Sequence, residues 1–509
     1  MYTSDGIYIG FANGERINMS LNMCNRHGLV AGASGTGKTI TMKVLTESFS
    51  DAGVPVFLCD VKGDVSGLVV PGEQTEGMEK RIDKFGIRDI FTYKSYPVTF
   101  WDIYGEKGHP IRATVSDLGP SLLARILGLT PAQEGVLEIV FRIADDNGLN
   151  LIDLKDLYAM LSYVGEHKQE LIPKYGNIAQ QSLGGIQRAL LPLENQGGDL
   201  FLGEPALNIY DWIRTDAEGH GMINLLSCEK LVLNPTLYAT FLLWLMTTLY
   251  ETLPEVGDLD KPKLVFFFDE AHFLFSDAPK TLVQKIEQVI KLIRSKGVGI
   301  YFVTQNPSDI PDGVLAQLSN RVQHALRAYT PSELKSVKAA ASSLRANPDF
   351  KTEEVIMELG VGEALISVLD ADGIPGIVQR ASVLCPQSLM AQADEASIRA
   401  AIASDQMTKY DESVDNISAY ETLEEQRARE EEARQLEEER IRLEKEKAAF
   451  EAQKAKEEAA AEKARQRQKE KEEAARQRAM ERRKNQIERQ IISAGAQILK
   501  RGLLNTLKK

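Results

Sequence analysis

Residues 32–39 are Gly32-Ala33-Ser34-Gly35-Thr36-Gly37-Lys38-Thr39, and they fit the phosphate-binding pattern G-x-x-x-x-G-K-S/T. Glycines let successive backbone N–H groups turn around an anion, and the helix that follows adds the positive end of its dipole. Lys38 suits the β and γ phosphates of a nucleotide, and Thr39 offers a hydroxyl to Mg²⁺. The flanking residues predict a short buried strand over 27–31 and a helix over 40–49, which is the context of a P-loop.

A second candidate segment lies far downstream, where an apolar run meets two acids in Leu264-Val265-Phe266-Phe267-Phe268-Asp269-Glu270. A continuous apolar run is typical of a strand covered on both faces, and open α/β sheets bind ligands at the carboxyl ends of such strands. We interpret Asp269 as the Walker-B acid that holds the Mg²⁺ water shell. We interpret Glu270 as the base that polarises the attacking water. The structural alternative is a capping Asp-Glu pair at a strand–helix junction.

Two further predicted strands end in polar residues. The strand over 297–303 leads to Gln305, which we expect near Glu270, where an amide can sense the γ phosphate or orient water. The strand over 54–59 leads to Asp60-Val61-Lys62-Gly63-Asp64, expected at the same sheet edge close to the P-loop. A solvated turn explains this charged cluster equally well, and the sequence assigns its three charged residues no role.

Composition indicates a soluble globular protein. The chain has 509 residues, of which 43% are hydrophobic and 26% charged, enough for a large core. Its four cysteines lack C-x-x-C spacing, which favours reduced thiols and no zinc site. The N-terminus has no signal pattern, and the longest apolar stretch, residues 237–250, is too short to cross a bilayer. We therefore expect a cytoplasmic protein without an integral membrane segment.

Charge is distributed unevenly along the chain. The net charge is −13, residues 421–490 contain 20 acidic and 20 basic side chains, and residues 491–509 add four basic ones. Residues 1–420 therefore carry −17. Phosphate contacts dominate nucleic-acid affinity, so any DNA site on this acidic part must be a local basic patch.

The pattern of predicted elements divides the chain into six regions. Residues 1–105 begin an α/β domain that contains the P-loop, residues 106–260 form a mostly helical insertion, and residues 261–390 complete the domain with the second acid pair. Residues 391–420 are expected to be a linker. A charged helix over 421–490 and an amphipathic basic helix over 491–509 follow.

The C-terminal region is rich in Glu, Lys, Arg, Gln and Ala. Acidic and basic residues recur at four-residue spacing, as in Glu425–Arg429, Glu430–Arg434, Glu438–Arg442 and Glu472–Arg476. No sustained a/d seam is visible, so we favour a solvated single helix, about 105 Å long, over a coiled coil. In the last segment, one face is predicted to carry Ile492, Ala496, Leu499, Leu503 and Leu507. That face is expected to dock on its own protein; a membrane surface or a partner is the alternative.

Several of these segments resemble a known family. Residues 27–39, 60–64, 266–272 and 304–306 resemble the HerA/FtsK superfamily of P-loop ATPases, and residues 108–112, 294–299 and 320–324 resemble its bacterial HerA-like members of the YjgR type. The resemblance covers about residues 5–390. It implies a RecA-like core, ATP and Mg²⁺ as ligands, and a hexameric ring. In such rings a neighbour's arginine completes each site; Arg294 is the first candidate here, with Arg321 and Arg327 as alternatives.

Two functions fit these observations. The first is a Mg²⁺-dependent ATP hydrolase that acts as a DNA translocase or helicase-like motor. The second is an ATP-dependent switch or assembly protein that acts on a protein partner through the C-terminal helix, without DNA. A small-molecule phosphotransferase is disfavoured, because the adjacent acids Asp269 and Glu270 suit activation of water.

Overall fold

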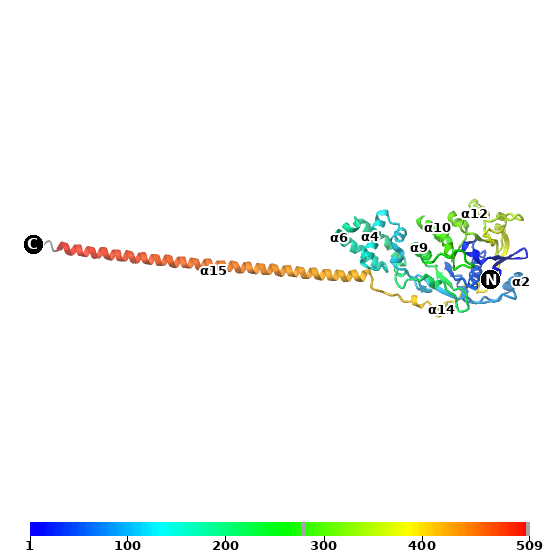
Figure 1. Cartoon of the computed structure of the whole chain (residues 1–509), viewed down its shortest axis with the longest axis horizontal. Coiled ribbons are helices and arrows are strands. Elements are labelled where there is room, and N and C mark those ends of the chain that lie inside the picture. Colours follow the sequence, from blue (N-terminus) through cyan, green and yellow to red (C-terminus); the bar gives the residue numbers. More distant parts are fainter. Residues whose placement is uncertain (276–279, 505–509) are drawn as a thin grey trace. The chain divides into compact units, whose positions relative to one another are not determined.

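The computed structural model describes residues 1–275 and 280–504, except for the side chains of residues 281 and 497–504 (Figure 1). It separates into two compact units, Met1–Leu423 and Glu424–Lys509. Among the helices that the structure describes, none combines the length and the apolar character needed to cross a bilayer.

The first unit is built on one mixed sheet, which has 13 strands within the described residues, in the order β1-β2-β13-β12-β11-β4-β10-β9-β5-β8-β6-β7, with β3 paired to β2. From β11 to β7 all neighbours are parallel, whereas β12, β13, β2, β1 and β3 pair antiparallel. The strands are β1 (Tyr2–Thr3), β2 (Gly6–Ala12), β3 (Glu15–Met19), β4 (Gly28–Ala31), β5 (Val56–Asp60), β6 (Val98–Asp102), β7 (His109–Pro110), β8 (Ile223–Ser227), β9 (Leu264–Phe268), β10 (Val298–Thr304), β11 (Asn320–Gln323), β12 (Glu363–Ser367) and β13 (Gln379–Val383).

Helices cover both faces of the parallel part, which explains the continuous apolar runs of its strands. Phe267 points to the face covered by α1 (Lys38–Asp51), where it packs in one core with Phe49. Phe266 and Phe268 point to the other face, into a core shared with α9 (Pro235–Thr252) and α10 (Lys280–Ile293). Successive side chains of one strand thus fill two separate cores, as the period of a strand requires.

The predicted helical block over 106–260 is only partly an insertion. Its α-helices are α3 (Val115–Ile126), α4 (Pro131–Asn147), α5 (Leu154–Glu166), α6 (Lys168–Tyr175), α7 (Gln180–Leu193), α8 (Asp199–Phe201) and α9, which packs on the sheet. The block also contains β8, which pairs in parallel with β5 and β6 and therefore belongs to the central sheet. The pattern hid this strand because the polar Asn224 lies within it. The buried Asn224 amide accepts from Trp101 Nε1 at 3.1 Å and donates to Val56 O at 3.3 Å.

Five further α-helices of this unit lie outside that block. They are α2 (Glu76–Lys84), α11 (Asp312–Leu315), α12 (Pro331–Ser342), α13 (Thr352–Glu358) and α14 (Glu395–Ser404). The predicted linker over 391–420 therefore contains a helix, and it is held to the core. His109 Nδ1 and Asp411 Oδ1 lie 2.6 Å apart, and Arg112 Nη1 donates to Tyr410 O at 2.8 Å.

The C-terminal region is one uninterrupted helix, α15 (Ala419–Leu504), so the structure has no break at residue 490 (Figure 1). Its side chains from residue 424 onward are largely exposed; Phe450, for example, is 71% exposed. Glu425 and Arg429 pair as expected, whereas Arg434 pairs with Glu438 and Arg442 with Glu446. On the predicted apolar face, Ile492 and Ala496 are exposed, while the side chains of Leu499 and Leu503, and the whole of Leu507, lie outside the described residues.

The core of the first unit ends inside α15, and this decides where the chain can be shortened. Ala419 is 0% and Leu423 2% exposed, and Glu421 pairs with Lys155 at 3.0 Å, so the start of α15 belongs to the first unit. We expect a chain ending at residue 430 to keep the unfolding midpoint of the full-length core. A chain ending at residue 418 loses a buried leucine, which costs about 1.5–3 kcal/mol, and melts several degrees lower.

Tryptophan fluorescence during thermal unfolding measures this difference, because Trp101, Trp212 and Trp244 all lie buried in the first unit. Insolubility of the chain ending at residue 430, or a midpoint as low as that of the shorter chain, would show that the rest of α15 supports the core.

Candidate functional site

The P-loop joins the end of β4 to the start of α1. Its backbone is anchored on the neighbouring strand segments, since Gly32 N donates to Thr304 O at 3.2 Å and Ala33 N to Ala325 O at 2.8 Å. Gly32 has φ +155°, and a Cβ there would come 2.5 Å from the Cβ of His324, so only glycine fits. Gly37, at φ +116°, is the N-cap of α1 and provides no side-chain cap. The first N–H groups of α1 are therefore available to an anion.

Lys38, the P-loop lysine, is buried and responds to the charges of several carboxylates. It is 7% exposed, and its Nζ donates to Ala33 O at 3.2 Å. Burial lowers the pKa of Lys38, while the charges of Glu270, Asp269 and Asp64 act in the opposite direction. The ammonium group is thus close enough to all three carboxylates to interact with them electrostatically.

Thr39, the last residue of the P-loop, and Asp64 bring two oxygen-bearing side chains together. Thr39 Oγ1 donates to Asp64 Oδ2 at 3.1 Å. The other carboxylate oxygen, Asp64 Oδ1, is buried and has no hydrogen-bond partner within the described structure. Oxygen ligands of this kind suit Mg²⁺, so the donor set fits the predicted metal. The sequence placed Asp64 at this edge without a role; its closeness to Thr39 appears only in the fold.

The predicted acid pair lies at the carboxyl end of β9, where the parallel strands present their ligand-binding edge. Asp269 is 5% exposed, and burial together with the charge of Glu270 raises the pKa of Asp269 to about 7. Glu270 adopts a left-handed backbone conformation with φ +46°, which is uncommon for a residue with a side chain. A strained backbone at a buried acid is typical of functional sites.

Two side chains hold the carboxylate of Glu270, and a third lies close to it. Lys62 Nζ forms an ion pair with it, and Gln305 Nε2 donates to both of its oxygens at 3.2 Å. His272 Nδ1 lies 3.3 Å from Glu270 Oε2. Burial raises the pKa of Glu270, but the hydrogen bonds from Lys62 and Gln305 and the charge of Lys62 outweigh it, so the pKa lies below its usual value. The structure thus places Gln305 beside Glu270, as its position after β10 indicates.

The Asp60 carboxylate holds the turn from which Lys62 and Asp64 reach two different residues of the site. Its carboxylate accepts from the backbone N–H groups of Lys62, Gly63 and Val65 at 3.2, 2.7 and 3.1 Å. These bonds fold the chain after β5 into a tight turn. The turn directs Lys62 to Glu270 and Asp64 to Thr39. Asp60 therefore positions Lys62 and Asp64, and both side chains of this turn have partners within the chain.

The three candidate arginines differ in the hydrogen bonds and ion pairs that they form within the chain. Arg294 precedes β10 and so lies at the sheet edge opposite the P-loop, where its Nη2 is 3.2 Å from Asp258 Oδ1. Arg321 donates to the carbonyls of Leu318, Ser343 and Leu315 at 2.8–2.9 Å. Arg327 donates to the carbonyls of Met357 and Leu359. Arg321 and Arg327 thus hold parts of their own chain together. The Arg294 side chain is 41% exposed, and its ion-pair partner Asp258 is more exposed still.

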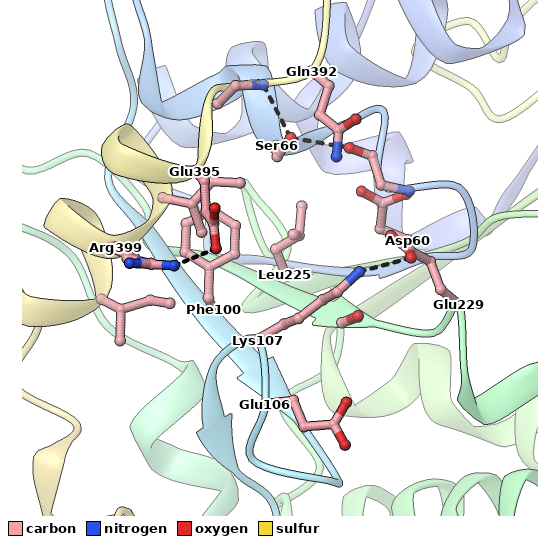
Figure 2. Close-up of a pocket in the computed structure, with 15 residues that line it drawn as sticks. Asp60, Ser66, Phe100, Glu106, Lys107, Leu225, Glu229, Gln392, Glu395 and Arg399 are labelled. Atoms are coloured by element: carbon pink, nitrogen blue, oxygen red, sulfur yellow. Dashed lines mark hydrogen bonds and ion pairs between the residues drawn. The ribbon is translucent and has the colours of Figure 1, made fainter.

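Two cavities border these residues. One, of about 300 Å³, opens beside Gly37 and Ile40 at the start of α1. The other, of about 290 Å³, adjoins the Asp60 turn and is shown in Figure 2, with Phe100 and Leu225 among its lining residues. In Figure 2 the Lys107–Glu229 and Glu395–Arg399 pairs lie among the residues that line it. No P-loop residue lines this second cavity, so it is distinct from the phosphate-binding region.

Comparison with known proteins gives a family and a fold. A family model described as helicase HerA-like C-terminal matches residues 9–509. No curated protein matches the chain. Three solved structures of the bacterial conjugative, or plasmid, coupling protein TrwB match this chain at 14% identity. The unbound form has a TM-score of 0.52 and covers 77% of this chain and 92% of its own. The complex with ADP and Mg²⁺ and the complex with a non-hydrolysable ATP analogue each have a TM-score of 0.53 and cover 78% of this chain and 92% of their own. At this identity the likeness shows the fold alone, and it confirms the predicted RecA-like P-loop core. The predicted long C-terminal helix is present in the structure itself as α15.

Proposed function

The chain belongs to the helicase HerA-like C-terminal family, and on that premise we propose that it is a Mg²⁺-dependent ATPase. The observation that carries the proposal is the convergence of Lys38, Asp269 and Glu270 at one sheet edge, although the first is far from the other two in sequence. The TrwB structures that contain ADP with Mg²⁺ or an ATP analogue support the same ligands for this fold.

Each residue of the site has a role in the proposed reaction. Lys38 and the N–H groups of the P-loop hold the β and γ phosphates. Thr39 and Asp269, with the unpartnered oxygen of Asp64, are the residues that would hold Mg²⁺, which neutralises phosphate charge when bound. They fit it through their oxygen atoms, of which Asp64 Oδ1 is buried without a hydrogen-bond partner in the described structure.

Glu270 then acts on the attacking water. Its lowered pKa keeps the carboxylate ionised at neutral pH, so it is ready to accept a hydrogen bond from water. Gln305 fixes the orientation of this carboxylate through two hydrogen bonds. Lys62 pairs with the same carboxylate, which ties the position of the base to the turn after β5.

We further propose that hydrolysis drives a hexameric ring that moves along DNA. The helicase description of the family supports this output. The alternative is a switch that acts on a protein partner through α15, which the net charge of −17 on residues 1–420 favours. Phosphate release measured with single- and double-stranded DNA over a range of salt concentrations separates the two. Stimulation that fades with salt supports the motor, and a rate indifferent to DNA supports the switch.

A ring of this kind predicts that Arg294 acts on the neighbouring site. We expect Arg294→Ala to bind ATP normally and to hydrolyse it about 1,000-fold more slowly, the lower end for loss of an arginine finger. The fold should tolerate the change, because the ion pair with Asp258 is solvent-exposed and such pairs contribute little. Arg142→Ala, at a 71% exposed side chain on α4, is the matched control and should leave the rate unchanged.

Mixing mutant subunits distinguishes action in trans from action in cis. Arg294→Ala mixed with Glu270→Gln should regain part of the activity, because some interfaces then pair an intact Glu270 with an intact Arg294. Light scattering and a tagged-subunit pull-down must first show that oligomers form and exchange. Exchange without recovery would exclude Arg294 as the trans residue, and a monomer under all nucleotide conditions would exclude the ring.

A further inference from the structure

The large apolar side chains of α15 that the structure describes beyond residue 424 form two clusters near opposite ends of the helix. They are Leu436, Ile441, Leu443 and Phe450 in the first cluster, and Met480, Ile487, Ile491 and Ile492 in the second. All eight side chains are 42–73% exposed. Alanine is the only apolar residue between positions 451 and 479. Apolar side chains gathered in two places on an otherwise charged surface indicate a binding partner.

The two clusters share one side of the helix. Leu443 and Ile487 are 44 residues apart, and so are Leu436 and Met480. At 3.6 residues per turn, 44 residues end about 80° from the starting direction, and a slight right-handed winding with eleven residues in three turns brings them into line. α15 runs through both clusters as one uninterrupted helix (Figure 1). Its apolar side chains therefore form one stripe that is interrupted in the middle.

The net charge of the helix changes sign between its halves. Residues 421–460 contain 14 acidic and 9 basic side chains, which gives −5, and residues 461–490 contain 6 acidic and 11 basic ones, which gives +5. A parallel, in-register partner helix would place each half beside a half of the same sign. An antiparallel partner places the negative half of one helix beside the positive half of the other. Charge complementarity thus favours a second copy of this chain that runs in the opposite direction.

A single register brings the apolar clusters together as well. In an antiparallel pair centred on residue 465, Leu443 lies opposite Ile487 of the other copy, and Phe450 lies opposite Met480. By two-fold symmetry each of these contacts occurs twice. The alanine-rich middle offers small side chains, so the two helices can stay close between the clusters. Apolar contact and charge therefore agree on the same arrangement.

We propose that residues 424–496 of α15 pair with the same residues of a second copy, in an antiparallel arrangement centred near residue 465. Neither helix needs a continuous a/d seam for this, because each cluster covers the cluster at the other end of its partner. The pairing does not depend on the proposed ATPase, and it gives the C-terminal helix a role in assembly. An anionic membrane surface is the alternative partner for the basic half, and vesicles test it.

Single cysteines in the full-length chain test direction and register. Leu443→Cys and Ile487→Cys, each prepared separately, should form a disulfide-linked dimer under copper–phenanthroline oxidation only after they are mixed. Each variant alone should stay unlinked, because its two cysteines lie about 66 Å apart in the pair, the rise of 44 residues. The four native cysteines are buried, so the wild type should stay unlinked too.

Lys445→Cys is the matched control for this cross-link. Lys445 is exposed, and two positions along a helix turn its side chain about 200° away from that of Leu443. Lys445→Cys mixed with Ile487→Cys should therefore link at least about tenfold less than the Leu443→Cys mixture. Equal linkage in the two mixtures would reflect random collision and would overturn the proposed register.

Sedimentation over a range of concentrations measures the association itself. Leu443→Gln/Ile487→Gln should weaken self-association of the full-length chain by about tenfold or more, the effect of losing buried apolar contacts. Ala449→Gln/Ala460→Gln, with two new glutamines on the opposite side of the helix, should associate like the wild type. The chain that ends at residue 430 shows how much association the core makes by itself.

Three outcomes would overturn the inference. Linkage of Leu443→Cys with itself would show a parallel pair. No linkage in the mixture, with an association that Leu443→Gln/Ile487→Gln leaves unchanged, would show that the helices do not pair. If the mixture stays unlinked and the full-length chain, but not the chain ending at residue 430, sediments with phosphatidylglycerol vesicles, the apolar stripe belongs to a membrane surface.

Discussion

Glu270→Gln is expected to bind ATP with nearly wild-type affinity and to hydrolyse it at least about 100-fold more slowly, the scale for loss of a general base. The amide has the size of the carboxylate, so the buried position beside Gln305 stays filled. It lacks the negative charge that polarises water and that pairs with Lys62. Single-turnover phosphate release, with ATP affinity measured separately, assigns the loss to the chemical step.

A control variant makes this result specific to the site. Glu353→Gln makes the same chemical change at an exposed residue of α13 and should leave both affinity and rate unchanged. Wild-type turnover by Glu270→Gln would contradict the assignment of Glu270 as the base. Loss of ATP binding in that variant would instead give the residue a role in holding the nucleotide.

Lys38→Ala is expected to abolish turnover and to weaken ATP binding by at least about tenfold from the lost charge-assisted hydrogen bonds alone. The effect should exceed that limit, because the charges of Asp64, Asp269 and Glu270 all act on this ammonium group. Without the positive charge of Lys38, less of the repulsion between these three carboxylates and the phosphates is offset. Equilibrium binding of ATP with Mg²⁺ measures the loss.

Folding must be checked alongside this variant because Lys38 is buried. An unchanged thermal unfolding midpoint of Lys38→Ala without nucleotide shows that the loss concerns the ligand and not the core. Lys80→Ala, on the exposed face of α2, is the matched control and should bind ATP normally. Tight ATP binding by Lys38→Ala would remove the P-loop lysine from the phosphate site.

The strands that carry the site could be predicted because each is a short apolar run buried on both faces. Residues 264–268 and 298–303 are of this kind, and the structure places them side by side as β9 and β10. The strand β11 was not predicted, since Asn320 and Arg321 make it polar and tertiary contacts hold it in place. The Asn320 amide, for example, donates to Met23 O at 3.1 Å and to His27 O at 3.3 Å.

The roles of the charged cluster after β5 could not be predicted, because they depend on contacts across the sheet. Lys62 lies 208 positions from Glu270, and only the fold brings them together. The end of the core was missed for a related reason. Leu423 resembles the sparse apolar residues of the charged helix, such as Leu436, yet it is 2% exposed while Leu436 is 61% exposed.

The central claim is that this chain hydrolyses ATP at the site formed by the P-loop and the acid pair of β9. Steady-state phosphate release by the purified full-length chain, with Mg²⁺ and with a chelator in its place, tests it most directly. The account predicts release that requires Mg²⁺ and falls to background in Lys38→Ala. Release at the same rate in the chelator or in Lys38→Ala, or no release by the wild-type chain with or without DNA, would contradict it.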